Sequence, residues 1–586
     1  MKQIKRLQVV VTLAFAVAIA CFFALFYPHH LHFQEQYQLF LFQWSYAADV
    51  CGVPGGVADY IGRFLTQFFL FAWAGASLIM LVLMGIQRCT LQLLQSETKE
   101  PAIWPFVLSF LPSIAMWRFL CDENALMSAP VALLLLLLLA IAVRKIGPKK
   151  LRWVVSLLSI PLAYFLAGGL SLIYAAILII DLLRQERTLL SVSLALVMGI
   201  AALSVPAAWH HGVSISLQRL FIGPHYYRYQ DSFAIWAWTA AIIVAVAFAL
   251  NKYLNRLPKK QPGVAFHLAG CAAMLVLTAG TIGHAYSELK EEMFSYDFMA
   301  RTGQWNRILT LSDKKTPNNQ ISVTALNLAL GKKGLMADNM FNYIQNGTSG
   351  LLADFVRDPV SPLVTSEAYY HLGMIHACQH YVFEAQEAIP DYQKSGRCYK
   401  RLAETNLIGG SYEVARKYLM ALQNTLFYRD WANETIALLG NEEAIAKHPE
   451  YGQLRAFRVN EDFFFNEHEL PQMLGLFFLS NPQNRMAFEY LSAVYLLRRD
   501  IDSFQHYFSL SQPLGYRPIP RVYQQALLLH WSRDHSASEP IPGYIQQDVV
   551  QGLNTFISLA QGPNANPERA KAQFGNTYWA YFFYHD

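Results

Sequence analysis

The sequence of 586 residues lacks the short motifs that mark most soluble enzymes. It has no phosphate-binding glycine loop, no GxSxG, no HExxH and no dinucleotide fingerprint, so nucleotide-driven transport, soluble-type hydrolysis and redox chemistry lose support. Its seven cysteines form no CxxC pair and show no zinc spacing. No continuous Lys/Arg patch occurs outside the loops that flank apolar runs, so no nucleic-acid partner is expected.

Charged residues are scarce in the first half, and 54% of all residues are hydrophobic. A bilayer span needs about 17 to 25 helical residues. Apolar runs of this kind, with one uncharged stretch split at Gly168-Gly169, predict nine spans at 8–27, 64–86, 103–120, 128–143, 153–166, 170–183, 188–206, 232–250 and 264–283. The expected fold is therefore all-α, with a polytopic transmembrane helix bundle at 1–283 and a second helical domain at 284–586.

The orientation follows from Lys and Arg near the span ends, which favour the cytoplasmic side. The first 21 residues resemble a signal peptide, but the apolar run continues to Phe26, so we expect an uncleaved first span. With the N-terminus inside, only Arg63, Arg118, Arg219 and Arg228 lie outside. The inner set has sixteen members: Lys2, Lys5, Arg6, Arg88, Lys99, Arg144, Lys145, Lys149, Lys150, Arg152, Arg184, Arg187, Lys252, Arg256, Lys259 and Lys260. With an odd number of spans, this asymmetry places the second helical domain outside the membrane, facing the periplasm or the cell exterior.

Paired amphipathic helices recur in the second half, at 366–389, 399–422 and 484–508. Gly410 stands at the turn of the second pair, which comes near the tetratricopeptide pattern. We therefore expect an extracytoplasmic α-solenoid of tetratricopeptide-like hairpins, whose surface is suited to a protein partner. Cys378 and Cys398 also lie in this half, and their spacing leaves open whether they form a disulfide.

The polar stretch 28–63 between the first two apolar runs is too long for an ordinary connection. Its aromatic segment from Glu35 to Tyr46 suits a helix lying in the membrane interface. Val53-Pro54-Gly55-Gly56 then breaks the chain. Asp59 and Arg63, four residues apart, are spaced for a helical ion pair.

Three acids lie close to the outer ends of spans: Glu35 after the first, and Asp122 with Glu123 after the third. Adjacent carboxylates suit a divalent cation such as Mg²⁺ or Mn²⁺, so Asp122 and Glu123 are the candidate metal ligands. A lone glutamate facing a cavity suits a general base, which makes Glu35 the candidate catalytic residue. The alternatives are that Glu35 is solvated and that Asp122 pairs with Arg118.

The outer loop 207–231 offers candidate phosphate-binding residues. Guanidinium groups bind phosphate well, and the candidates here are Arg219 and Arg228 with His210 and His211. The alternative is an aromatic belt of Tyr226, Tyr227 and Tyr229, with Arg228 extending among the rings.

This order of features resembles the GT-C class of polyprenyl-phosphate-dependent glycosyltransferases: a cytoplasmic N-terminus, an acid in the first outer loop, acids in the second, and an outer C-terminal domain. The resemblance implies that Glu35 is the catalytic base, that Asp122 and Glu123 bind metal, and that the donor is a lipid carrying a phosphate sugar. Some members also carry a tetratricopeptide array. The Trp-Trp-Asp signature of oligosaccharyltransferases is absent.

The segments 400–432 and 326–341 resemble an uncharacterised family of multi-pass membrane proteins from Bacteroidota, DUF6057, over nearly the whole chain. That resemblance implies no activity.

Three functions follow as hypotheses: a GT-C-like transferase, a non-enzymatic scaffold whose helical domain recruits cell-envelope partners, and a transporter or flippase for a lipid-linked substrate. A transferase predicts that the acids and outer arginines share one cavity. A scaffold predicts scattered acids and a largest groove in the second domain. Few polar residues lie within the spans, chiefly Gln67, His267 and Asp181, which disfavours transport.

Overall fold

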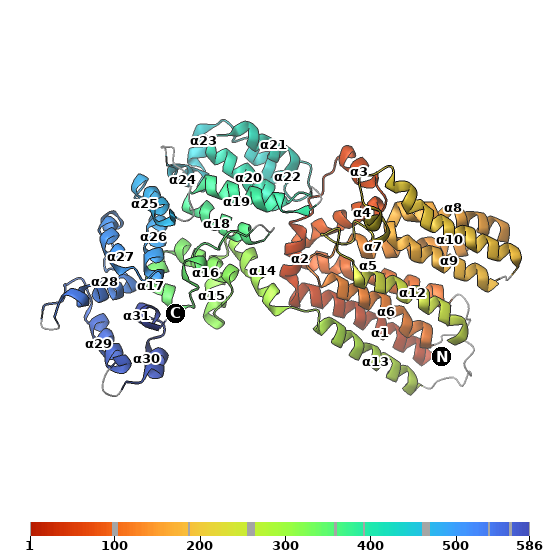
Figure 1. Cartoon of the computed structure of the whole chain (residues 1–586), viewed down its shortest axis with the longest axis horizontal. Coiled ribbons are helices and arrows are strands. Elements are labelled where there is room, and N and C mark those ends of the chain that lie inside the picture. Colours follow the sequence, from red (N-terminus) through yellow and green to blue (C-terminus); the bar gives the residue numbers. More distant parts are fainter. Residues whose placement is uncertain are drawn as a thin grey trace. The chain divides into compact units, whose positions relative to one another are not determined.

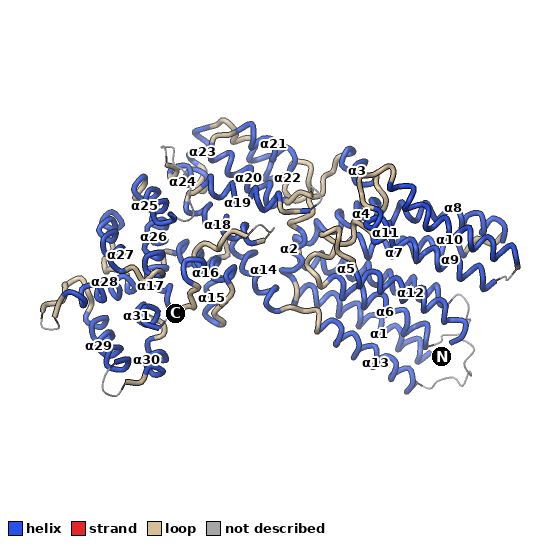
Figure 2. The backbone as a smooth tube through the Cα atoms, viewed as in Figure 1, coloured by secondary structure: helices blue, strands red, loops and turns tan. Residues whose placement is uncertain are grey.

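The computed structural model describes residues 2–95, 103–185, 188–254, 264–356, 360–390, 393–459, 469–536, 539–561 and 565–584. Over these residues the protein is built of helices and loops, without strands, as the sequence predicted (Figures 1 and 2). The chain divides into two compact units. Unit 1 comprises residues 1–291 with 424–426, and unit 2 comprises residues 292–423 and 427–586.

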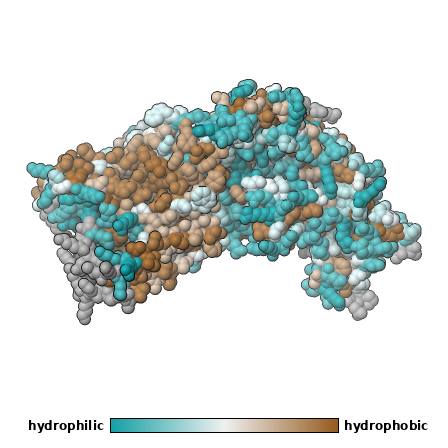
Figure 3. Space-filling model, turned by 180° about the vertical axis from the view of Figure 1, so that it is seen from behind, coloured by the Kyte–Doolittle hydropathy of each residue, from teal (hydrophilic) through white to brown (hydrophobic). Residues whose placement is uncertain are grey.

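Unit 1 contains long apolar helices packed around one core. Its principal helices are α1 (Lys2–Cys21), α5 (Ala72–Gln95), α6 (Ile103–Leu120), α7 (Ser128–Arg144), α8 (Lys149–Ala167), α9 (Ser171–Gln185), α10 (Leu189–His210), α12 (Ile235–Leu254) and α13 (Val264–Gly283). Large apolar side chains also remain on the surface, including Leu13 and Val17 on α1 and Leu196 and Ile200 on α10. Figure 3 shows a broad apolar surface over this unit. Such a surface is unfavourable in water and suits lipid.

Five helical segments of the described chain are long and apolar enough to cross a membrane. A sixth is counted if α13 and the bent helix after it form one span. The five are Gln3–Phe26, Ala72–Gln95, Ile103–Leu120, Lys149–Gln185 and Leu189–His210. Nine spans are thus not shown. The predictions at 128–143 and 232–250 fall on the shorter apolar segments Ser128–Arg144 and Ile235–Asn251, that at 264–283 falls on the bent pair, and those at 153–166 and 170–183 fall on one counted segment.

The segment Lys149–Gln185 is long enough to be counted as one span, but the chain reverses its direction in the middle of it. The Ser159 and Tyr174 hydroxyls lie 2.6 Å apart, and Arg152 donates to the Gln185 side chain. The start of α8 therefore lies beside the end of α9, so the two helices are antiparallel. The reversal occurs at Gly168, whose φ of 71° favours glycine. The split that the sequence predicted at Gly168-Gly169 is therefore present.

Basic residues predicted to lie on one side of the membrane meet at one end of unit 1. Arg144 pairs with Asp181 at 3.2 Å and donates to the Leu93 carbonyl at 3.0 Å. Arg184 donates to the carbonyls of Phe248 and Ala249. These contacts join the ends of α5, α7, α9 and α12. Lys99, Arg187, Arg256, Lys259 and Lys260 of the same set lie outside the described residues.

The stretch 28–63 forms three short helices rather than the expected arrangement. They are α2 (Pro28–Glu35), α3 (Trp44–Cys51) and α4 (Gly56–Thr66). The predicted helix from Glu35 to Tyr46 is wrong, because α2 ends where that helix was expected to start and the next helix begins at Trp44. Phe40 instead packs its ring against those of Tyr60 and Phe64. The predicted pair of Asp59 with Arg63 is confirmed, at 2.7 Å.

Unit 2 is a succession of shorter helices, most of which pack against their neighbours along the chain. The helix α14 (Glu288–Arg301) enters it, and the others are α15 (Trp305–Lys314), α16 (Gln320–Lys333), α17 (Met336–Asn339), α18 (Ser361–Leu372), α19 (Ile375–Glu387), α20 (Gly396–Gly409), α21 (Tyr412–Leu422), α22 (Arg429–Ile436), α23 (Glu442–Lys447), α24 (Tyr451–Ala456), α25 (Leu470–Ser480), α26 (Arg485–Leu497), α27 (Ile501–Phe508), α28 (Arg521–Asp534), α29 (Gln547–Gln561), α30 (Pro567–Phe574) and α31 (Tyr578–Tyr584).

The three predicted helix pairs of unit 2 correspond to α18–α19, α20–α21 and α26–α27. Gly373 and Gly410 end the first helix of the first two pairs, with φ of 83° and 86°. In this left-handed conformation glycine closes a helix without steric cost. Cys378 and Cys398 are both buried and free, so no disulfide joins these helices.

Candidate functional site

The predicted acids Asp122 and Glu123 line one cavity of unit 1, with a volume of about 340 Å³. It opens where α6 and α13 end and α12 begins. Its charged lining residues are Arg118, Asp122, Glu123 and Lys290, and its aromatic ones include Tyr27, Tyr227 and Trp236. The cavity therefore brings two cations and two carboxylates together.

Backbone pairing places Tyr227 beside Asp122. Ala125 and Tyr227 form an antiparallel bridge, and the Arg228 backbone N–H donates to the Asn124 carbonyl at 2.9 Å. The Tyr227 hydroxyl donates to Asp122 Oδ2 at 2.7 Å, while the Asn124 backbone N–H donates to Oδ1 at 2.9 Å. The alternative pairing of Asp122 with Arg118 is absent, because both carboxylate oxygens have these other partners. Burial first, and then the Asp122 carboxylate, raise the pKa of Tyr227.

Glu123 is held by Lys290, whose Nζ lies 2.7 Å from Oε1 and 2.8 Å from Oε2. Burial acts to raise the pKa of Glu123, but the hydrogen bonds from Lys290 outweigh it and keep that pKa below its ordinary value. Glu123 is therefore an ionised carboxylate with a fixed counter-ion.

The four carboxylate oxygens of Asp122 and Glu123 thus all accept hydrogen bonds from protein donors. A divalent cation needs such oxygens as ligands, and these would first have to lose the Lys290 ammonium. Nor do the described residues contain any group of three or more His, Cys, Asp or Glu placed to hold a metal ion. The arrangement does not fit Mg²⁺ or Mn²⁺, and no step is derived through a metal.

Arg118 is the cation of this cavity that has no carboxylate partner among the described residues. Its guanidinium lies over the Trp236 ring, 5.4 Å from the centroid, and donates weakly to the Thr281 carbonyl at 3.5 Å. An adjoining groove of about 380 Å³ shares Arg118, Trp236 and His284 with the cavity. Its other lining residues are Val276, Leu277, Gly280 and Thr281 of α13. A polar cavity thus borders a mainly apolar groove, with a guanidinium at the junction.

Glu35 does not line this cavity. It is the last residue of α2 and is only 6% exposed, so it is not the solvated interfacial residue that one interpretation of the sequence expected. Its neighbour Gln34 contacts the acidic loop instead, donating to the Asp122 carbonyl at 3.1 Å and to the Ala125 carbonyl at 3.2 Å. The structure therefore brings α2 against the loop without bringing the Glu35 carboxylate to the cavity lining.

The expected phosphate-binding residues are also not among those that line the cavity. Arg219 makes a bidentate pair with Asp231 at 2.8 and 2.7 Å. His210 and His211 are exposed at the end of α10. Arg228 is buried against the Tyr37 ring, 4.1 Å from its centroid, rather than extending into a belt of the nearby tyrosines. Burial lowers the pKa of this arginine.

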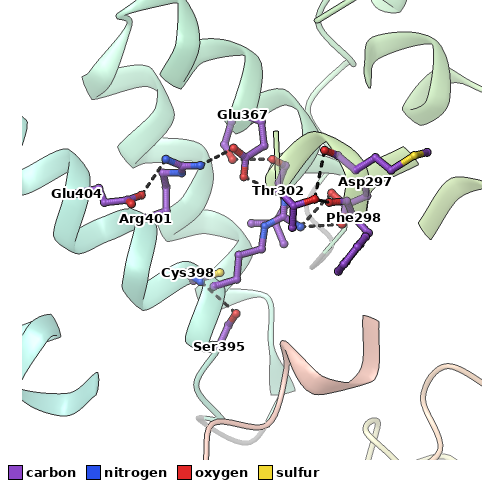
Figure 4. Close-up of polar contacts among 12 residues, drawn as sticks. Asp297, Phe298, Thr302, Glu367, Ser395, Cys398, Arg401 and Glu404 are labelled. Atoms are coloured by element: carbon purple, nitrogen blue, oxygen red, sulfur yellow. Dashed lines mark hydrogen bonds and ion pairs between the residues drawn. The ribbon is translucent and has the colours of Figure 1, made fainter. Parts of the chain in front are cut away.

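Unit 2 contains a buried network of five charged side chains that the sequence analysis missed (Figure 4). Arg397 pairs with Asp297 at 2.8 Å and with Glu367 at 3.1 Å. Arg401 pairs with Glu367 and, at 2.8 Å, with Glu404. Burial acts to raise the pKa of Glu367, but the two arginines outweigh it and lower that pKa to about 2. The signal lay in α20, where residues 397, 401 and 404 are spaced to share one helix face.

Arg401 and Glu404 of this network also line a cavity of unit 2 with a volume of about 1000 Å³. Its other charged residues include Lys332, Lys333 and Lys400. Sequence reasoning could not assemble this cavity, because its lining comes from α14 to α26.

Over its described residues the protein is all-helical, with several helices long and apolar enough to cross a membrane, and each of its two units contains a cavity lined by charged residues. The chain belongs to the family described as "Family of unknown function (DUF6057)", whose model matches residues 2–585. No curated protein and no solved structure matches the chain. That description assigns no function to the family.

Proposed function

We propose that this protein binds a phosphate-bearing lipid in the unit-1 cavity and transfers a sugar from it, in the manner of GT-C glycosyltransferases. One observation carries the proposal: the charged cavity shares Arg118, Trp236 and His284 with a mainly apolar groove along α13. A polyprenyl phosphate has the same two parts, an anionic headgroup and an apolar tail. Arg118 is the group suited to the phosphate, because a guanidinium forms strong charge-assisted hydrogen bonds with it.

The assignment of residues differs from the one that the resemblance implied. Asp122 replaces Glu35 as the base, because it lines the cavity and its partners are a tyrosine hydroxyl and a backbone N–H. In the proposed step an acceptor hydroxyl loses its proton to Asp122 and its oxygen bonds to the anomeric carbon. The bond from that carbon to the phosphate breaks, and Arg118 stabilises the leaving polyprenyl phosphate. Glu123 keeps the Lys290 ammonium in place in the same cavity.

The proposed location is the bacterial inner membrane, with a cytoplasmic N-terminus and a periplasmic unit 2 built as a tetratricopeptide-like solenoid. The segregation of Arg144, Arg152 and Arg184 at one end of unit 1 supports this orientation. Glu443→Cys on the exposed surface of unit 2 is expected to react with a membrane-impermeant maleimide in spheroplasts. Lys145→Cys is expected to react only after permeabilisation, and the opposite pattern would contradict the orientation.

Lipid binding is tested with the purified protein in nanodiscs and undecaprenyl phosphate as the probe. Arg118→Gln is expected to weaken binding roughly 10- to 100-fold, the value of one lost charge-assisted hydrogen bond. Arg152→Gln, at the other end of the bundle, is the matched control and is expected to bind like the wild type. Equal affinity for undecaprenol, which lacks the phosphate, would contradict the proposal.

Sugar transfer is tested by the release of polyprenyl phosphate from a radiolabelled polyprenyl phosphate sugar with a cell-envelope acceptor extract. Asp122→Asn is expected to abolish release while leaving lipid binding intact, and EDTA is expected to have no effect. Lipid binding without any release would support a binding protein rather than a transferase.

A non-enzymatic scaffold is the second candidate, because the cavity of unit 2 is larger than that of unit 1 and only two of the predicted site residues share a cavity. In that case unit 2 recruits cell-envelope partners. Cells lacking the gene would then be complemented by Asp122→Asn but not by variants of the unit-2 cavity. The reverse result would favour the transferase.

A further inference from the structure

The unit-2 cavity is formed where several helices end. The turn from α14 to α15, the last turn of α16, one face of α20, the turn from α23 to α24 and the turn from α25 to α26 all contribute. Its volume of about 1000 Å³ is at the upper end of the range for small-ligand sites. Trp305 and Phe457 provide apolar surface within it.

Cations outnumber acids in this cavity by six to two. The acids are Glu404 and Glu450, and the cations are Arg301, Lys332, Lys333, Lys400, Arg401 and Arg485. Two of the cations are already paired: Arg401 with Glu367 and Glu404, and Arg485 with Glu489. The remaining four form no ion pair with a described residue. Arg301 lies over the Phe298 ring and Lys400 over the Trp431 ring, at 5.1 Å in each case.

Helix ends alone do not explain this convergence. Lys332 and Lys333 lie in the last turn of α16, where cations favour the helix dipole. Lys400, however, lies in the first half of α20, so its charge has no such role. Lys332 is exposed as a residue, yet desolvation of its ammonium lowers its pKa even though Glu450 acts to raise it. Cations brought together in this way repel one another, and an anion would relieve the repulsion.

The ion network of unit 2 contributes Arg401 and Glu404 to the lining of this cavity. Arg401 is fixed by Glu367 and Glu404 and stacks on Tyr370, 3.6 Å from the ring centroid. Its carboxylate partners Glu367 and Glu404 pair with this arginine, whereas Lys332, Lys333 and Lys400 form no ion pair with a described residue. The cavity therefore combines one arginine that is paired with carboxylates and three lysines that form no ion pair with a described residue.

We propose that the unit-2 cavity binds a small polyanion, a ligand with two or more phosphate or carboxylate groups. Lys332, Lys333, Lys400 and Arg301 are its charge partners, and Trp305 contacts its less polar part. This inference is independent of the lipid site in unit 1. It requires neither Arg118 nor Asp122.

The test uses the full-length protein in detergent and isothermal titration calorimetry at low ionic strength. The probes are inositol hexakisphosphate and benzenehexacarboxylate, which carry six anionic groups of different chemistry on rings of similar size, with neutral myo-inositol as the blank. We expect at least one hexaanion to bind and its affinity to fall as salt is added, because screening weakens interactions between charges in contact with solvent. The tighter of the two identifies phosphate or carboxylate as the natural group.

Lys332→Gln/Lys333→Gln is expected to weaken binding at least tenfold, and Lys400→Gln provides a second, single variant. Lys314→Gln/Lys447→Gln removes the same charge from exposed positions of unit 2 outside the cavity and is expected to bind like the wild type. Absence of binding by the wild-type protein would overturn the proposal. So would equal losses in the cavity and control variants, since these would indicate non-specific attraction to a basic surface.

Discussion

The buried ion network of unit 2 allows a quantitative prediction for Glu367→Gln. The Glu367 side chain is 2% exposed and lies between two arginines. Its pKa falls from the ordinary 4.5 to about 2, which at ~1.4 kcal/mol for each pKa unit corresponds to about 3 kcal/mol of stability at neutral pH. Removing one partner of a buried pair typically costs about 3 to 5 kcal/mol, which agrees.

The substitution keeps the shape of the side chain but leaves Arg397 and Arg401 without the charge between them. Amide hydrogen exchange of the full-length protein in detergent reports the local free energy of opening. Exchange in peptides from α18 and α20 is expected to become on the order of 100-fold faster in Glu367→Gln, because each 1.4 kcal/mol is a factor of ten. Glu443→Gln removes an exposed partner of Lys447 and is the control, with no expected change.

The pH dependence provides an independent check. A carboxyl group whose pKa is lower in the folded state stabilises fully above its unfolded pKa, and that stabilisation is lost as the pH falls toward the folded value. The difference between wild type and Glu367→Gln should therefore be largest above pH 4.5 and shrink toward pH 2. Wild-type protection in Glu367→Gln at pH 7 would refute the reasoning, as would a difference that grows on acidification.

Two further predictions concern single contacts. Asp59→Asn removes the carboxylate that lies 2.7 Å from the Arg63 guanidinium, so we expect a loss of about 3 kcal/mol, measured as a lower thermal unfolding midpoint in detergent. The control is Asp231→Asn, which should leave the midpoint unchanged, because the Asp231 side chain is 81% exposed in its pair with Arg219. Equal shifts in the two variants would contradict burial as the cause. In Gly410→Ala the new Cβ has no atom within 4 Å, so the only expected loss of stability is the ~1 kcal/mol cost of a left-handed backbone at a residue with a side chain. Gly373→Ala places a Cβ 2.7 Å from Phe457 Cβ and should lower the unfolding midpoint further. The opposite order of midpoints would exclude steric contact as the larger effect.

Local features of the fold could be predicted from the sequence because they depend on neighbouring residues. Apolar length indicated most long helices, and Gly410 was typical of the turn that it occupies. The spacing of Asp59 and Arg63 indicated their contact. Boundaries were less accurate: α5 begins at Ala72 rather than near 64, because Phe71 is extended and Gln67–Leu70 form a 3₁₀ turn.

The candidate site could not be predicted in the same way, because its contacts join distant parts of the chain. Asp122 and Tyr227 are 105 residues apart, and Glu123 and Lys290 are 167 residues apart. The sequence correctly brought the two acids to one loop but could not show that their oxygens already have donors. Nor could it show that α2 places Gln34 against that loop while Glu35 does not line the cavity.

Both cavities contain charged groups that are already paired, beside cations that form no ion pair with a described residue. We expect the second kind to matter most for binding. In unit 1 Lys290 neutralises Glu123 and the Tyr227 hydroxyl hydrogen-bonds to Asp122, while Arg118 has no carboxylate partner among the described residues. In unit 2 Arg401 is compensated by Glu367 and Glu404, while Lys332 and Lys333 form no ion pair with a described residue. A cation that already pairs with a carboxylate gains less from an anionic ligand than a cation without an ion pair, although both lose hydration on binding. Each cavity should therefore select an anion through its uncompensated cations, and the apolar groove beside Arg118 is what distinguishes a lipid from a soluble polyanion.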